Sequence, residues 1–296
     1  MYQLYFKFIN KTFLLETNSL IIFNILKMEL WPSESNNYVQ KLRIIYVGSG
    51  FAIDNVYDNY VAMTDIQHIV GYDKKEHCEC LFVTQASTIQ PVRNFIAAMV
   101  CSNYKEDKNF LVLHASCITK KNHGILILGK KHSGKTTLSL EMIANYNYHL
   151  VTDDLSFLVL RGSSVYCYSL FKGLHLNNET FDYFNGFSSD IYNVDSPKTR
   201  YYVKNVMNRS RVSYLILSEV DGSAAMPTLS KDSLEKGIDI ICDNYVNFTS
   251  DVRSVITAKT QALMQKKIRL SACCFGKDIE SSGMYLNNIL ISSDDG

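Results

Sequence analysis

The stretch of residues 124–143 constrains the fold of this chain more than any other part of the sequence. It opens with an apolar run, residues 125–128, of the kind that forms a buried strand. Residues 129–136 match the phosphate-loop pattern G-x-x-x-x-G-K-[ST] at every fixed position. Apolar residues at helical spacing follow from residue 138 onward. A strand, a glycine-rich loop and a helix in this order are the setting that the motif requires, so the stretch predicts an α/β fold around a nucleotide phosphate site.

The chemistry of this loop indicates what it binds. Its two glycines let the backbone curl so that N–H groups point at phosphate oxygens, and the helix N-terminus adds its positive end. Lys135 is expected to reach the β- and γ-phosphates and the Thr136 hydroxyl to ligate Mg²⁺, so ATP and Mg²⁺ are the expected cofactors. The residues expected to contact the nucleotide are Gly129, Lys130, Lys131, His132, Ser133, Gly134, Lys135, Thr136 and Thr137. The alternative is a chance match in a glycine turn, which the correct setting on both sides disfavours.

Composition and charge describe an ordinary globular chain. Its 296 residues suffice for one large domain or two modest ones, with 47% hydrophobic and 20% charged residues. A formal net charge of +1 argues against a nucleic-acid-binding protein with a broad basic surface. No apolar run reaches the length of a membrane span, and the first residues do not resemble a signal peptide. We therefore expect a cytoplasmic protein without nucleic-acid or membrane partners.

The cysteines are expected to be mostly small core residues, because a reducing compartment disfavours disulfides. The sequence contains eight of them, and the run His77-Cys78-Glu79-Cys80 resembles half of a zinc site. No second Cys/His pair at ligand spacing follows this run, so the sequence alone does not predict a structural metal there.

The chain is expected to divide at a charged connector into an N-terminal α+β module, residues 1–105, and a catalytic domain, residues 106–296. In the module we expect strands 2–9 and 12–16, a helix 20–30 capped by Asn18 or Ser19, strands near 42–47 and 81–84, and a helix 91–104. In the catalytic domain we expect a strand 110–116, the loop strand and helix, a strand 149–152, a hairpin over 157–170, a strand 214–217, mostly helix over 234–263, and a closing strand 269–275.

A pair of carboxylates, Asp153 and Asp154, follows the strand after the loop helix. The carboxyl ends of parallel strands meet at one edge of a sheet, so the pair should face the phosphates bound by Lys135 and Thr136. One carboxylate can hold Mg²⁺ while the other accepts the proton of an attacking hydroxyl. The alternative is an Asp pair that only begins a turn.

Three segments in this order resemble a known family. Residues 113–115 (Leu-His-Ala), the phosphate loop, and residues 150–154 (Leu-Val-Thr-Asp-Asp) look like the catalytic domain of HPr kinase/phosphorylase and its kinase-only relatives, over about residues 110–170. The resemblance implies that Asp153 takes the proton of a serine and that His114 lies near the transferred phosphate. It also implies that Lys135 and Thr136 bind phosphate and metal. With Asp153 as the base, Asp154 is then the carboxylate of the pair that we expect to support the metal. A structural role for the strand-end histidine is the alternative.

Two departures from this family affect the expectations. The Gly-rich signature of the bifunctional enzymes is not found between Tyr168 and Phe187, so phosphorolysis, the reverse reaction, is not expected. Glu179 is the remaining candidate for the acidic metal ligand, and a solvated loop carboxylate is the alternative. Residues 1–105 do not resemble the regulatory domain of the large members. They are similar to the N-terminal half of compact kinases, some of which accompany gene clusters for ribosomally made peptides such as lasso peptides.

The expected protein is therefore a phosphate-loop kinase of the type shared with phosphoenolpyruvate carboxykinase, with a small N-terminal α+β module. Its expected reaction is transfer of the γ-phosphate of ATP to a serine, or less favourably a threonine, of a protein or peptide such as a ribosomally made precursor. A small-molecule or phosphoenolpyruvate carboxykinase-like phosphotransferase is one alternative, although the extra metal ligands and substrate arginine of the latter are not found. A regulator that binds ATP without transfer is another, and homo-oligomerisation stays open.

Overall fold

The computed structural model contains two compact units, Met1–Glu106 and Asp107–Gly296. The boundary expected from the sequence lies one residue earlier, between residues 105 and 106. The structure describes residues 1–47, 60–62, 68–73, 76–83, 89–130, 132–176, 184, 191–194, 200–220, 228–230, 234–248, 251, 253–266, 268–275 and 278–292. Within these residues, no helix has both the length and the apolar character needed to cross a lipid bilayer.

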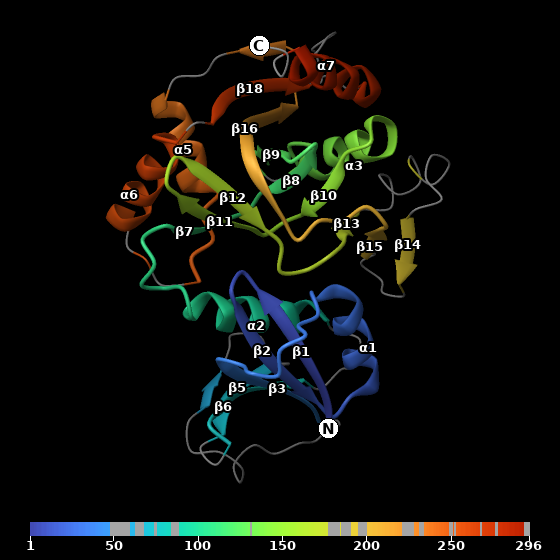
Figure 1. Ribbon diagram of the computed structural model, residues 1–296, viewed down its shortest axis with the longest axis vertical. Coiled ribbons are helices and arrows are strands. Elements are labelled where there is room, and N and C mark those ends of the chain that lie inside the picture. Colours follow the sequence, from blue (N-terminus) through green and yellow to red (C-terminus); the bar gives the residue numbers. More distant parts are fainter. Residues whose placement is uncertain are drawn as a thin grey trace. The chain divides into compact units, whose positions relative to one another are not determined.

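The first unit is a six-stranded mixed sheet with two helices (Figure 1). Its strands lie in the order β1-β2-β3-β6-β5-β4, with β2, β3 and β6 parallel to one another and the other pairs antiparallel. The bounds are β1 Tyr2–Phe8, β2 Lys11–Thr17, β3 Gln40–Tyr46, β4 Tyr60–Ala62, β5 His68–Asp73, β6 Cys78–Val83, α1 Leu20–Glu29 and α2 Ile89–Ser102.

The opening hairpin and the first helix confirm what the sequence predicts. Ser19 caps α1, and its side chain accepts a hydrogen bond from the backbone N–H of Ile22. Phe6 and Phe13 stack across the hairpin with ring centroids 5.3 Å apart, which is a favourable cross-strand aromatic pair. The buried guanidinium of Arg93 on α2 donates to the buried carboxylate of Glu29, so this ion pair ties the two helices together.

The second unit is built on a nine-stranded mixed sheet. Seven of its strands follow the order β10-β8-β9-β16-β12-β11-β7, and β18 pairs with β16 and β17. The bounds are β7 Phe110–Leu113, β8 Ser116–Lys120, β9 His123–Leu128, β10 His149–Thr152, β11 Ser156–Arg161, β12 Ser164–Tyr168, β16 Arg209–Val220, β17 Thr228–Ser230 and β18 Arg269–Phe275. A small sheet contains β13 Leu174–His175, β15 Arg200–Val203 and β14 Ile191–Val194. The helices are α3 Lys135–Tyr146, α5 Leu234–Asp243, α6 Arg253–Met264 and α7 Ile279–Ser292.

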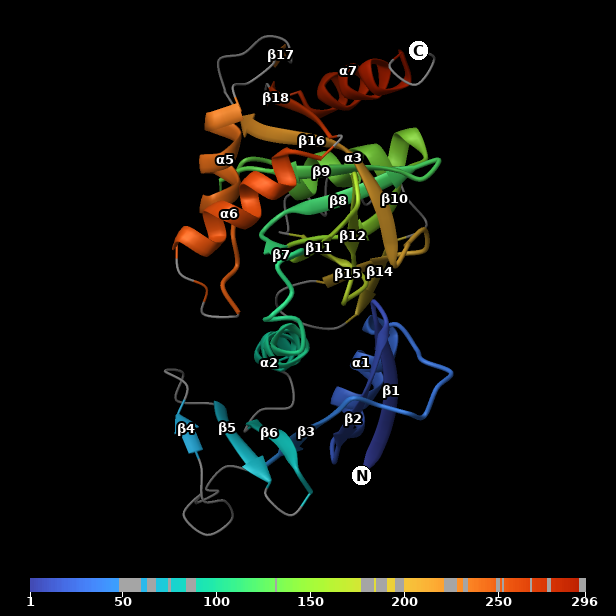
Figure 2. The same cartoon turned by 60° about the vertical axis from the view of Figure 1, so that its left-hand side comes forward.

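Both faces of strand β9 are buried, as its continuous apolar sequence predicts. Leu126 and Leu128 join a core cluster that includes residues of α5 and α6. Ile125 and Ile127 join a second cluster that includes residues of α3 and α7. The helix pairs therefore cover different faces of the sheet, and Figure 2 shows α5 and α6 together on one side. This rigid, two-sided packing holds the end of β9, where the phosphate-loop sequence begins.

Several elements differ from the sequence prediction. The expected strand 110–116 is two strands, because β7 pairs with β11 while β8 pairs with β9 and β10, and the chain bends between them at His114. The helical stretch 234–263 is interrupted, since Tyr245 forms a bridge with Leu113 and the backbone N–H of Val246 donates to the carbonyl of Val112. Helix α7 was not predicted. Strand β10 does not neighbour β9, because β8 lies between them. Both are antiparallel to β8, so they still run in the same direction.

Candidate functional site

The loop between β9 and α3 takes a shape that requires both glycines of its pattern. Gly134 precedes the first helical residue with φ 78°, in the left-handed region that favours glycine. A Cβ on Gly129 would collide with the backbone carbonyl of Ser218 and with the side chain of Ser133. Ser218 is there because β16 runs parallel to β9, with Leu217 opposite Leu128. The close approach of β16 therefore leaves space only for a tightly turned loop at the carboxyl ends of β9 and β16. We call this loop, residues 129–134, the curl.

Lys135 folds back across this curl. Its ammonium Nζ donates to the carbonyl oxygens of Gly129 at 2.9 Å and of Lys130 at 3.0 Å. Burial lowers the pKa of the Lys135 ammonium, and the negative charges of Asp153 and Asp154 oppose that shift. The lysine thus lies within electrostatic reach of both carboxylates that the sequence assigned to the site.

One polar atom inside the curl has no partner among the described residues. The Oγ of Ser133 is buried without a hydrogen bond, although the carbonyl of the same residue accepts one from Ser218 Oγ at 2.5 Å. A buried hydroxyl without a partner is costly unless a ligand completes its bonding. The glycine cradle and this hydroxyl both fit an anionic ligand such as a nucleotide phosphate.

Thr136, at the start of α3, connects the loop to the carboxylate pair. Its Oγ1 donates to Asp153 Oδ1 at 3.1 Å and lies 3.4 Å from Oδ2. Asp153 is buried, with 7% of its surface exposed, and it directly follows β10. A hydroxyl and a carboxylate at this separation are ligand types that Mg²⁺ prefers, so the pair fits the metal that the sequence predicts.

The backbone also turns at this pair. Asp154 has φ 66°, and the N–H of Leu155 donates to the carbonyl of Asp153 at 2.8 Å. After this turn, the second carboxylate lies beside the bend between β7 and β8. There Asp154 Oδ1 lies 3.6 Å from His114 Nε2, and 42% of each side chain is exposed. The tight turn therefore gives the two carboxylates different neighbours and different access to solvent.

The structure brings together most of the residues that the sequence singled out. Lys135, Thr136, Asp153, Asp154 and His114 lie at the same edge of the sheet, through the contacts given above. Lys131 and Glu179 fall outside the described residues. Within the described part of this unit, no three His, Cys, Asp or Glu side chains gather as a metal-binding group.

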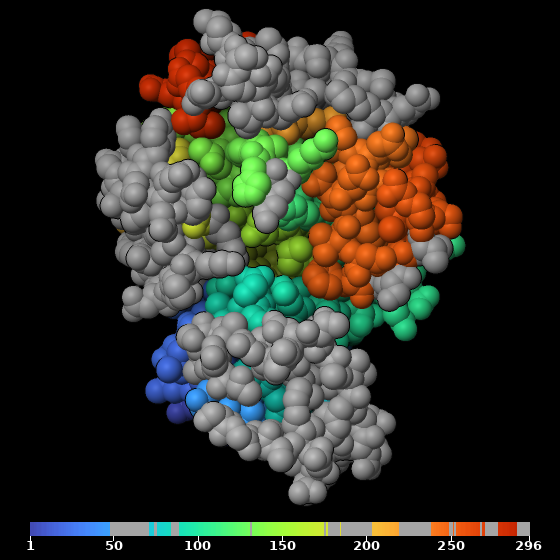
Figure 3. Space-filling model, turned by 180° about the vertical axis from the view of Figure 1, so that it is seen from behind, coloured from blue at the N-terminus to red at the C-terminus, as the bar shows by residue number. Residues whose placement is uncertain are grey.

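The sequence analysis did not identify the residues that hold the site-bearing strands and helix in place. Ser116 Oγ lies 2.8 Å from Ser139 Oγ and 3.3 Å from the carbonyl of Thr152, so a buried hydroxyl pair ties β8, α3 and β10 together. The backbone N–H of His114 donates to the carbonyl of Asn244 at 2.7 Å, which fixes the bend. Of the supporting residues, Ser218 could have been found from the sequence, because it directly follows the predicted buried strand 214–217. Figure 3 shows green atoms of the loop and helix segment at the surface beside the orange helices α5 and α6.

Comparison with known proteins adds little to this geometry. No protein-family model matches the chain. No curated protein is detectably similar to it in sequence. Among solved structures, the HPr(Ser) kinase/phosphatase from Coxiella burnetii is similar with 13% sequence identity and a TM-score of 0.33, over 62% of this chain and 95% of that chain. A likeness this low carries no argument, and the functional case depends on the site itself.

Proposed function

We propose that the second unit is an ATP- and Mg²⁺-dependent kinase that phosphorylates a serine hydroxyl of a protein or peptide. The observation that carries this proposal is the hydrogen bond between Thr136 and Asp153, which joins the phosphate-loop hydroxyl to a buried carboxylate. A loop that only bound phosphate would not need a carboxylate at that position. Phosphoryl transfer needs one, because a divalent ion has to be held against the phosphates.

The loop supplies the phosphate contacts of the proposed enzyme. Lys135 donates to two loop carbonyls, and phosphate oxygens are stronger acceptors that would take over these bonds. Ser133 Oγ and the backbone N–H groups at the start of α3 add further donors. Thr136 and Asp153 would hold Mg²⁺, which neutralises charge on the phosphates when bound.

Proton acceptance belongs to Asp154 in this proposal. The sequence analysis assigns the base to Asp153, by resemblance, and the metal to Asp154, and two contacts favour the opposite division. Asp153 is buried against Thr136, whereas 42% of the Asp154 side chain is exposed and open to an acceptor hydroxyl. His114 lies 3.6 Å from Asp154 and would orient it. A carboxylate that serves a protein or peptide substrate has to be reachable from solvent.

Substitution of Lys135 by alanine tests this proposal directly. Labelled ATP is incubated with the protein and a set of acceptors, including peptides encoded beside its gene, and ATP–Mg²⁺ affinity is measured by calorimetry. We expect Lys135→Ala to lose transfer by about a hundred- to thousandfold while its circular dichroism stays that of wild type, because Lys135 is the first residue of α3 and its ammonium contacts loop carbonyls rather than apolar core side chains. Lys108→Ala, an exposed lysine of the same unit, is the matched control and should keep wild-type transfer. Wild-type transfer by folded Lys135→Ala protein contradicts the proposal.

A further inference from the structure

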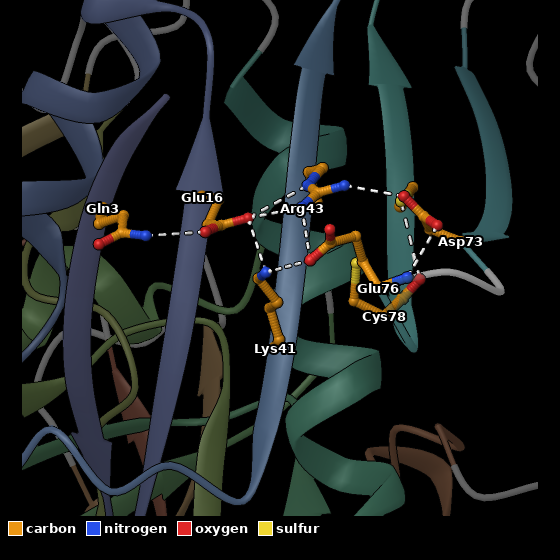
Figure 4. A network of polar contacts seen from close by, with 8 residues as sticks. Gln3, Glu16, Lys41, Arg43, Asp73, Glu76 and Cys78 are labelled. Atoms are coloured by element: carbon orange, nitrogen blue, oxygen red, sulfur yellow. Dashed lines mark hydrogen bonds and ion pairs between the residues drawn. The ribbon is translucent and has the colours of Figure 1, made fainter.

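Three potential metal ligands meet on one face of the sheet in the first unit, within the polar network drawn in Figure 4. Cys78 and Cys80 are two residues apart on β6, so their side chains point to the same face. Asp73 of β5 lies directly opposite Cys78 in the antiparallel register. Among the described residues, these three form a group of His, Cys, Asp or Glu side chains close enough together to hold a metal ion.

The distances between the ligand atoms of this group are at most about 1 Å longer than those in a tetrahedral zinc site. One ligand atom from each of Asp73, Cys78 and Cys80 lies within 4.8 Å of the other two. In a tetrahedral zinc site, metal–ligand bonds of about 2.0–2.3 Å place ligand atoms about 3.5–3.8 Å apart. Metal binding would draw the three ligand atoms together by rotation of their side chains. The Cys80 thiol donates weakly to the carbonyl of Cys78 at 3.7 Å, a bond that costs little to exchange.

The register neighbours of Cys80 on the adjacent strands are a glycine and an arginine. Gly71 lies opposite Cys80 on β5 and has no side chain on the shared face. Arg43 lies opposite Cys80 on the other side, from the parallel strand β3. A water molecule next to Gly71 would complete a tetrahedral set of two sulfurs and two oxygens.

The carboxylate of Asp73 is already oriented by outer contacts, as metal-ligating carboxylates are. Arg43 Nη1 donates to its Oδ2 at 2.8 Å, and the backbone N–H of Glu76 donates to its Oδ1 at 3.0 Å. Each carboxylate oxygen has two lone pairs, so both contacts are compatible with a bond to a metal. The same Arg43 is anchored on its other side by Glu16, 2.8 Å away.

The charge of the network accommodates a divalent cation. Glu16, Asp73 and Glu76 are balanced in part by Lys41 and Arg43, with contacts of 2.8–3.2 Å along the chain of partners. A dication that displaces the two thiol protons leaves the total charge of this network unchanged. Two thiolates, a carboxylate and Zn²⁺ carry one net negative charge, and the neighbouring guanidinium of Arg43 offsets it.

We propose that Asp73, Cys78 and Cys80 form a Zn²⁺ site in the first unit, with water as the fourth ligand. The third protein ligand comes from the preceding strand of the hairpin, which is why a search for a second Cys/His pair in the sequence does not find the site. His77 is not a member of this group, and its Nδ1 lies 3.4 Å from the hydroxyl of Tyr72. Two thiolates with a carboxylate in a tetrahedral arrangement select Zn²⁺ over Mg²⁺ or Ca²⁺.

A disulfide is the competing use of two neighbouring thiols. Residues two apart on a strand have Cα atoms about 6.4–6.8 Å apart, at the upper limit of disulfide geometry. A metal tolerates that spacing because it inserts between the sulfurs. The bound ion would clamp the β5–β6 hairpin, so metal binding should raise the stability of the folded chain by mass action.

Cobalt substitution tests the site without reference to any enzymatic activity. The full chain is reduced, freed of metal with a chelator, and titrated with Co²⁺, which reports tetrahedral thiolate ligation by its thiolate-to-metal charge-transfer and intense d–d absorption. We expect one Co²⁺ per chain, displaced by Zn²⁺, with loss of the charge-transfer band in the double variant Cys78→Ser/Cys80→Ser. Asp73→Asn should weaken Co²⁺ binding by about tenfold or more. Cys101→Ser, which removes a buried thiol of helix α2, is the matched control and should bind Co²⁺ as wild type does.

Two outcomes overturn the proposal. One is a wild-type spectrum without thiolate ligation, or one that persists in the double variant. The other is a Cys78–Cys80 disulfide in protein purified without oxidant, found by mass spectrometry of peptides. X-ray absorption of Zn²⁺-loaded wild-type protein decides the case even where the variants fail to fold, because the proposal requires two sulfur neighbours at about 2.3 Å.

Discussion

Replacement of Gly129 by alanine probes the phosphate loop through a clash that the structure defines. The added Cβ would meet the carbonyl oxygen of Ser218, which is held in the β-sheet, and the side chain of Ser133. Backbone in a sheet cannot move aside as a flexible side chain can, so the loop itself has to shift. Overpacking of this kind costs about 1–3 kcal/mol of unfolding free energy. Because the same shift opens the curl, we expect Gly129→Ala to lose most of its affinity for ATP–Mg²⁺ as well.

Gly162→Ala is the matched control for this prediction. Gly162 has φ +56°, and an alanine Cβ there would have no other residue's atoms within 4 Å beyond its chain neighbours, so the substitution introduces strain but no clash. It should cost about 1–2 kcal/mol of stability and leave nucleotide affinity unchanged. Urea unfolding followed by circular dichroism measures the first quantity, and calorimetric titration with ATP–Mg²⁺ measures the second. Wild-type affinity in Gly129→Ala would refute the inferred role of the tight curl.

Two further predictions concern the direction of the reaction and the stability of helix α3. The absence of the bifunctional signature predicts that inorganic phosphate releases no pyrophosphate from the phosphorylated product at a rate near the forward one, and a comparable rate would contradict it. Burial raises the pKa of the Glu141 carboxyl, Glu280 and Asp278 raise it further, and a hydrogen bond from Asn145 opposes the shift. Ionised Glu141 therefore costs stability as pH rises above 4.5, so Glu141→Gln should be more stable than wild type at pH 7 and lose that advantage below the unfolded-state pKa. Equal pH profiles of unfolding for the two proteins would refute that cause.

The parts of the site that the sequence predicts are those encoded locally. The loop pattern, its flanking strand and helix, and a carboxylate pair at a strand end all lie within about thirty residues, and periodicity with turn chemistry is enough to place them. The hydrogen bond between Thr136 and Asp153 agrees with that order even though β8 lies between β9, which precedes the loop, and β10, which precedes Asp153.

The parts that the sequence does not predict depend on pairings between distant segments. The bend at His114 exists because residues on its two sides join different strands of the sheet. The contact of Asn244 with that bend joins segments 130 residues apart, and Asp73 reaches the cysteines only through the β5–β6 register. Hydrophobic pattern does not specify such long-range partners, because many registers bury the same apolar residues.

The division of labour between Asp153 and Asp154 offers the most direct test of the proposed kinase. Single-turnover transfer from labelled ATP, to candidate acceptors and to water, is measured for wild type, Asp153→Asn and Asp154→Asn, with ATP–Mg²⁺ affinity determined on the same preparations. Asparagine keeps the shape of aspartate but does not accept a proton at neutral pH. We predict that Asp154→Asn binds ATP–Mg²⁺ as wild type does and transfers about a hundred- to ten-thousandfold more slowly. Asp153→Asn should instead need more Mg²⁺ for half-maximal rate, because it loses a charged partner of Thr136.

Two results of that measurement contradict the proposal in different ways. Slow chemistry with normal binding in Asp153→Asn, together with a raised Mg²⁺ requirement in Asp154→Asn, would restore the roles expected from the sequence. Wild-type protein that binds ATP–Mg²⁺ and transfers phosphate to no acceptor, water included, would contradict catalysis altogether and leave a nucleotide-binding regulator.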